Sequence, residues 1–133
     1  MNKLKATITH IESQEHLSLV QVKTQQIDLQ VLLTDTPQSV NYLTLGNEIE
    51  ILFKETEVIL SKTPLHQEIA LNNHLPCTIQ HVELGKILSK IHLNFGDQSL
   101  QAILTTNICQ KLQFQTGQAI VAMVKANEIM CAL

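Results

Sequence analysis

The sequence predicts an all-β protein built from two tandem, five-stranded β-barrels of the OB type, each with a short helical turn. Three observations support this prediction. The 133-residue chain aligns with itself at an offset of 71 without a gap, and sixteen of the 62 aligned pairs are identical, as a tandem duplication requires. Apolar residues mostly recur at every second position, as in strands with one buried face. Five strands in about 60 residues form a small barrel.

The repeat divides the chain into a first unit over residues 1–62, a linker over residues 63–71 and a second unit over residues 72–133. Pro64 and its polar neighbours are typical of a connector. A domain of about 60 residues buries only about 60% of its unfolded surface and is marginally stable alone. We therefore expect the units to support each other.

In the first unit, an initial strand begins near Asn2, and Gln25-Gln26 forms a hairpin turn between two strands. Alternation then predicts strands over 29–33 and, after Gly46, over 49–53. Residues 35–43 lose the alternation and predict a helical turn. The second unit repeats this order, with strands over 91–95 and 120–124, a turn at Gly96-Asp97 and a helical turn within 106–114.

Composition excludes several classes of partner. The nine basic residues are all Lys, the formal net charge is -3, and aromatic residues make up 3%. Such a chain lacks the basic surface and the stacking side chains of nucleic-acid binders. It has no apolar run of the roughly 18 to 20 residues that span a bilayer, and its three dispersed cysteines fit reduced thiols. We expect a cytoplasmic protein with no nucleic-acid or membrane partner.

No pattern typical of catalysis is found. The sequence has no Ser/His/Asp order, no paired-carboxylate motif and no Gly-rich phosphate loop. His10 and His81 are equivalent in the repeat, but no second ligand lies at a zinc spacing, so a surface or interface histidine explains them better. We expect neither an enzyme nor a metal site nor an organic cofactor.

Several apolar residues fall on the outward phase of their strands. Apolar side chains on both faces of a strand indicate that the outer face packs against something. This predicts contacts with the sister unit or with further subunits, and hence a homo-oligomer. The residues are Leu32, Leu52, Leu60, Ile103 and Met123.

Two motifs point to a family. The chain begins with an Asn-x-Leu-x-Ala-Thr-Ile pattern from Asn2 and ends with Val-Lys-Ala-x-Glu-Ile from Val124. In these motifs and in its repeat it resembles the molbindins, the Mop or TOBE domains that bind molybdate and tungstate, in their tandem form. The resemblance implies OB-like barrels, a homotrimer of tandem chains, and oxyanion sites between barrels. It implies storage or homeostasis of molybdate or tungstate as the function.

The resemblance also implies which residues bind the oxyanion. Three stretches are involved: the Asn of an N-terminal motif, a Thr after the third strand, and a Lys-Ala-x or Lys-x-Thr segment near the end of each unit. The family's Ser and Arg beside the Asn are missing, and Pro37 and Ile108 stand where a Ser is expected after the Thr. The implied oxyanion-binding residues are Lys125, Ala126, Asn127, Lys54, Thr56, Asn73, Asn2, Thr34 and Thr105.

A tetrahedral dianion offers only acceptors, so its site needs several N–H and O–H donors and one or two positive charges. Glu55 disfavours an anion beside Lys54, and we therefore expect the Lys125 segment to bind more strongly. Each residue also has a plainer interpretation: Lys54 and Lys125 as solvated side chains, Asn2 and Asn73 as groups that satisfy backbone. The alternative function is a non-catalytic, oligomerising or regulatory interaction module that has lost oxyanion binding.

Overall fold

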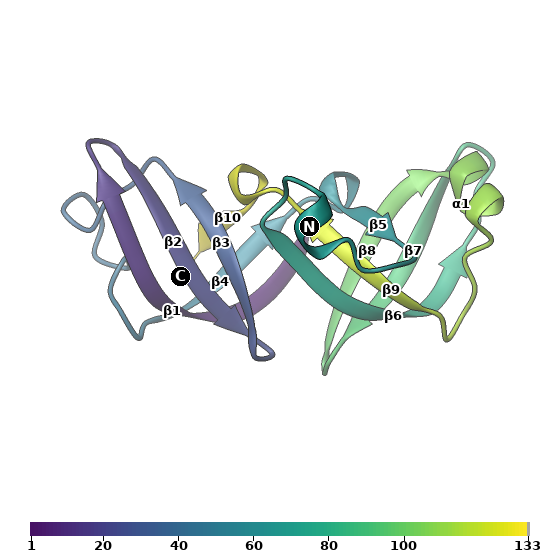
Figure 1. Ribbon diagram of the computed structural model, residues 1–133, viewed down its shortest axis with the longest axis horizontal. Coiled ribbons are helices and arrows are strands. Elements are labelled where there is room, and N and C mark those ends of the chain that lie inside the picture. The colour runs from purple at the N-terminus through teal and green to yellow at the C-terminus, as the bar shows by residue number, and fades with distance from the viewer. Residues whose placement is uncertain (133) are drawn as a thin grey trace.

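The computed structural model describes residues 1–132, with Gln67 described by its backbone alone. Ten strands form two five-stranded antiparallel sheets that lie side by side (Figure 1). The first sheet has the order β10-β4-β1-β2-β3 and the second the order β5-β9-β6-β7-β8. Each sheet curls around buried apolar side chains, as the predicted pair of barrels requires.

The strands of the first sheet follow the alternation seen in the sequence. Inward positions such as Leu4, Val20 and Ile51 are fully buried, and their neighbours in sequence are half-buried or exposed. The bounds are β1 (Asn2–Gln14), β2 (Leu17–Thr24), β3 (Ile27–Leu33), β4 (Glu48–Phe53) and β10 (Met130–Ala132).

The second sheet repeats this arrangement with equivalent residues, for example Leu75 for Leu4 and Ile91 for Val20 in the core. The bounds are β5 (Ile59–Ser61), β6 (Asn73–Glu83), β7 (Leu88–Phe95), β8 (Gln98–Thr105) and β9 (Ala119–Val124).

The last strand of each repeat belongs to the sheet of the other repeat. β10, from the second repeat, pairs with β4, with Cys131 opposite Ile51. β5, from the first repeat, pairs with β9, with Leu60 opposite Ala122. Figure 1 shows this exchange as the yellow β10 among the purple and blue strands. Each sheet is therefore completed by the other half of the chain, and the sequence alone did not predict this.

Two short 3-10 turns bring the halves into contact. η1 (Glu55–Glu57) follows β4 and packs against β8 of the second sheet, and η3 (Ala126–Glu128) follows β9 and packs against β3 of the first. The two contacts are equivalent under the offset of 71 residues. They define two seams between the barrels.

The predicted turns occur where the sequence placed them. Gln25 and Gln26 both have positive φ, 50° and 63°, as a two-residue hairpin turn requires. Gly46 and Gly117 lie just before β4 and β9 and adopt φ of 82° and 88°. Their N–H groups donate to the carbonyls of Ile8 and Ile79.

The segments that were predicted to hold helical turns differ between repeats. The second contains α1 (Thr106–Leu112), which ends at Gln113 in the left-handed conformation. The first forms only hydrogen-bonded turns around Thr36 and Ser39. There the Ser39 hydroxyl accepts from the Thr36 N–H and donates to the Thr36 carbonyl, so local side-chain contacts replace a helix.

One of the outward apolar residues, Met123, is buried within the chain. The linker leads from β5, on one side of β9, to β6, on the other side, and contains η2 (His66–Glu68). Val121 and Met123 of β9 are buried although they lie outside the main core cluster. Met123 is thus covered within the chain, whereas Leu32 remains 38% exposed.

Candidate functional site

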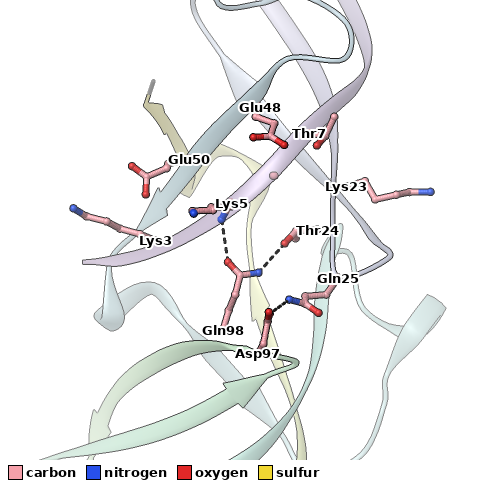
Figure 2. Close-up of a pocket in the computed structure, with 11 residues that line it drawn as sticks. Lys3, Lys5, Thr7, Lys23, Thr24, Gln25, Glu48, Glu50, Asp97 and Gln98 are labelled. Carbon is pink, nitrogen blue, oxygen red and sulfur yellow. Dashed lines mark hydrogen bonds between the residues drawn. The ribbon is translucent and has the colours of Figure 1, made fainter.

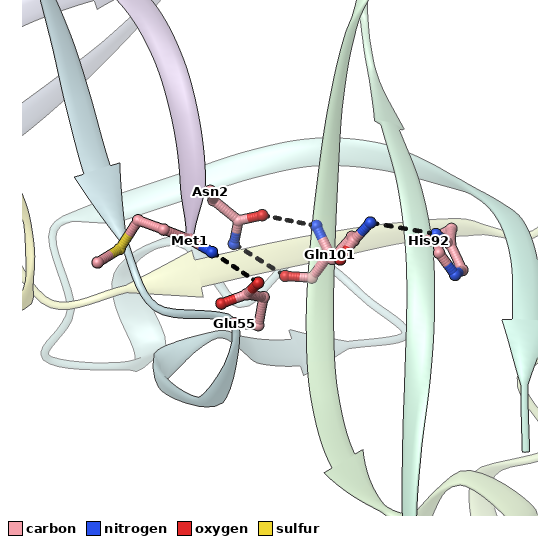
Figure 3. A network of polar contacts seen from close by, with 5 residues as sticks. All are labelled: Met1, Asn2, Glu55, His92 and Gln101. Carbon is pink, nitrogen blue, oxygen red and sulfur yellow. Dashed lines mark hydrogen bonds and ion pairs between the residues drawn. The ribbon is translucent and has the colours of Figure 1, made fainter. Parts of the chain in front are cut away.

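Asn2 and Asn73 connect the two barrels through identical contacts. The Asn2 amide donates to the carbonyl of Gln101 and accepts from its N–H, both at 2.8 Å (Figure 3). Asn73 makes the same pair with the backbone of Gln30, at 2.9 Å and 2.7 Å. Both Asn side chains are buried. One of the two N–H donors of each amide is therefore occupied by the partner barrel, and the other is not bonded to protein.

Gln30 and Gln101 were not among the predicted site residues. They are equivalent under the offset, lie in the middle of β3 and β8, and contribute backbone rather than side-chain groups to these contacts. The sequence indicated these positions only in that both repeats have Gln there. Backbone contacts between units, however, leave no residue-type pattern in a sequence.

Lys54 and Lys125 lie at equivalent positions with almost identical backbone conformations. Lys54 follows β4 with φ -74° and ψ 145°, and Lys125 follows β9 with φ -71° and ψ 147°. Both are exposed, and among the described residues neither forms an ion pair. Because Asn2 pairs with Phe53 and Asn73 with Val124, each Lys follows directly after the residue opposite its Asn.

The structure therefore groups most of the predicted residues into two clusters. We call them the η1 seam, which contains Asn2, Lys54, Glu55 and Thr56 against β8, and the η3 seam, which contains Asn73, Lys125, Ala126 and Asn127 against β3. Thr56 and Asn127 are exposed at equivalent positions. Each seam combines one amide, one ammonium group and one further side-chain donor.

Thr34 and Thr105 lie apart from these clusters. Each is exposed and comes four residues after the Gln that contacts the Asn, which is about 13 Å along an extended strand. The hydroxyl of Thr105 donates to Oδ1 of Asn107 at the start of α1. Within one chain, the two threonines do not join the seam residues.

The two seams differ most at one position. Glu55 of the η1 seam accepts a hydrogen bond from the amino group of Met1 at 2.7 Å (Figure 3). This contact lowers the pKa of the Glu55 carboxyl, and the charge of Lys90 lowers it further. The η3 seam has the uncharged Ala126 at the equivalent position. The η1 seam thus contains a carboxylate with its own cationic partner, and the η3 seam does not.

A groove of about 530 Å³ lies between the outer face of β1 and β4 and the turn that joins β7 to β8 (Figure 2). Gln98 closes one side, because it accepts from the N–H of Lys5 and donates to Thr24. The charges of its walls cancel and do not favour a dianion, with Lys3 and Lys23 extending toward opposite sides. The charged residues are Lys3, Lys5, Lys23, Glu48, Glu50 and Asp97.

The histidines and cysteines form no further site. His81 faces His92 across β6 and β7, with ring centroids 5.6 Å apart. No group of three metal-ligating side chains occurs among the described residues. Burial raises the pKa of Cys77 to about 12, and burial together with Asp35 raises that of Cys131 to about 11. No helix within residues 1–132 is long and apolar enough to cross a bilayer.

Comparisons with known proteins agree with this architecture. Residues 70–131, just under half of the chain, match the model of the TOBE domain. The fold matches the cytoplasmic molybdate-binding protein ModG, in a form with molybdate bound, with a TM-score of 0.90, 18% identity and coverage of 99% of this chain and 95% of that one.

A molybdate-binding protein from Sporomusa ovata matches 44% of this chain and 87% of its own, with 28% identity and a TM-score of 0.43. No curated protein matches by sequence. Residues 70–131 thus contain the TOBE domain, the first half of the chain repeats that sequence at an offset of 71 residues, and the whole chain shares the fold of ModG.

Proposed function

We propose that this protein binds molybdate or tungstate at the seams between its barrels and serves storage or homeostasis of the oxyanion in the cytoplasm. The whole-chain fold shared with ModG, whose structure holds molybdate, supports this function. The TOBE match of the second repeat supports it as well.

The observation that carries the proposal is the composition of the η3 seam. It combines Lys125, Asn73 and Asn127 around one turn, and the acidic residue of that turn, Glu128, has an identical equivalent, Glu57, in the other seam. A molybdate or tungstate dianion has only acceptor oxygens and requires such donors together with positive charge. Lys acts there as a point charge, since the chain has no Arg to form a bidentate contact.

We further propose that three chains assemble and that Thr34 and Thr105 complete sites across the contacts between chains. The exposed apolar residues of the outer faces support an assembly. Leu17, Leu19 and Leu32 line a groove of about 500 Å³, and the equivalent groove of the second repeat, of about 220 Å³, includes Leu88 and Ile103. Both grooves lie on the solvent side of their barrels, where a second copy can cover them.

Titration calorimetry tests the proposal. The protein is titrated with molybdate, tungstate and sulfate, and the Lys125→Ala variant is measured in parallel. We expect binding of molybdate and tungstate, weaker binding of sulfate because it is smaller, and a loss of affinity of roughly tenfold or more in the variant, the effect of losing one charge-assisted contact. No heat with any anion at micromolar protein would contradict the proposal.

Two observations favour a second candidate, an oligomerising or regulatory module without a bound anion. The chain lacks Arg, and Glu55 introduces a negative charge into one seam. Elemental analysis of the purified protein distinguishes the two functions. Molybdenum or tungsten that remains bound after purification supports oxyanion binding, and a protein free of both that also gives no heat on titration supports the interaction module.

A further inference from the structure

The two seams share their main contacts, although the side chain of Gln101 contacts His92 and that of Gln30 accepts from Asn72. Each pairs an Asn amide with the backbone of a strand of the other barrel, and each places a Lys before a 3-10 turn that packs on that strand. The next position is Glu55 in one seam and Ala126 in the other. A functional difference between the seams is therefore expected to depend on this position.

The Glu55 carboxylate lies close to positively charged groups in its seam. One of its oxygens lies 2.7 Å from the amino group of Met1, and its charge is stabilised further by Lys90 of β7. Its side chain is only partly exposed, at 24%, so it is held against the protein rather than extended into water. A carboxylate and a tetrahedral oxyanion compete for the same donors and cations, and they repel each other at close range.

We infer that Glu55 is an internal substitute for the ligand, which closes the η1 seam to dianions and leaves the η3 seam as the one site of each chain that binds them. This inference rests on the proposed function and specifies its stoichiometry. The two seams of the chain are then functionally different. The η3 seam binds the dianion, and the η1 seam is an equivalent site that the Glu55 carboxylate keeps closed.

The test counts tungstate ions per chain by equilibrium dialysis and elemental analysis, with sulfate in excess to suppress weak binding. The wild type is expected to hold about one ion per chain and the Glu55→Ala variant about two. Glu55→Gln, which keeps the shape of the side chain and removes its charge, is expected to gain the additional ion as well. Ala126→Glu is expected to abolish binding in the wild-type background.

Glu57→Ala provides a matched control. Glu57 belongs to the same turn as Glu55, so its removal takes away one negative charge from that turn and leaves the contact between Glu55 and Met1 in place. This variant is expected to bind as the wild type does. Thermal unfolding of every variant verifies that each one is folded.

The outcomes separate this inference from the proposed function. An unchanged count in both Glu55 variants relative to the wild type overturns the inference, whatever that count is. A wild type that holds no ion overturns binding at the η3 seam, and therefore the proposed function, while a gain in the Glu55 variants would still show that Glu55 closes the η1 seam. A gain that occurs equally in Glu57→Ala would show a general charge effect and would also overturn the inference.

Discussion

The outer faces of the two sheets have the same strand arrangement but differ in polarity and burial at equivalent positions. On β4 of the first sheet, Glu50 points outward and contributes to an open groove. Its equivalent on β9, Val121, is 8% exposed and buried outside the core. The chain path also differs: the linker joins β5 and β6, which lie on the two sides of β9, whereas Glu50 of β4 lines an open groove. Two copies of one domain have thus diverged where the path of the chain differs, and their cores have stayed similar.

Lys5 and Pro76 are a second pair of equivalent positions at which the two repeats differ. The N–H of Lys5 in β1 is satisfied by the side chain of Gln98 from the other barrel. The equivalent residue in β6 is Pro76, which has no N–H to satisfy. Nearby, His74 contacts the carbonyl of Leu71 in the linker at 2.7 Å. The first repeat uses the other barrel's hairpin to complete this edge, whereas the second uses the linker.

The largest expected effect comes from transferring the charge of one outer face to the other. Val121→Glu places an unpaired carboxylate at a buried position, and we expect it to lower the free energy of unfolding by about 3 kcal/mol or more. The reverse change, Glu50→Val, lies in an open groove and is expected to have an effect within about 0.5 kcal/mol. Urea unfolding measures both. Equal effects would contradict the difference in burial between the two outer faces.

The Asn contacts between the barrels should have the next largest effect. Asn73→Ala leaves the N–H and carbonyl of Gln30 without their partner, and we expect a loss of about 2 kcal/mol in the free energy of unfolding. Asn2→Ala removes the equivalent contact with Gln101, and the similar geometry predicts a loss of similar size. A loss below about 0.5 kcal/mol in both variants would show that these contacts do not hold the barrels together.

The smallest expected effect concerns the carboxylate that distinguishes the seams. Its contact with the amino group lowers the Glu55 pKa, so the contact stabilises the fold above the unfolded pKa and this stabilisation is lost as the pH falls through the folded pKa. Glu55→Gln should therefore cost about 0.5 kcal/mol at neutral pH, as a partly exposed ion pair does, and nothing in strong acid. Unfolding followed from pH 7 to pH 3 measures this, with Glu128→Gln as the control in the other seam.

Much of the fold could be predicted because alternation and repetition are local properties. Leu29, Val31 and Leu33 indicate a strand without any knowledge of its neighbours. The exchange of β5 and β10 could not be predicted in the same way. Each is three residues long, and similar repeats offer either strand an equivalent edge, so the sequence pattern does not distinguish pairing within a repeat from pairing between repeats.

The site was predicted in part, for a similar reason. Equivalent positions identified Lys54 and Lys125, and the structure places them at equivalent seams. Of the two interpretations of Asn2 and Asn73, contact with backbone is the one that the structure contains. The contact of Glu55 with Met1 joins residues 54 positions apart, and no local pattern could have indicated it.

The most direct test of oxyanion binding at the seams is the anomalous signal of tungsten in a crystal soaked in tungstate. Binding at the η3 seam predicts a peak beside Lys125 and Asn127 and none beside Lys54. A map without a peak at either seam would contradict the account of this protein as an oxyanion carrier.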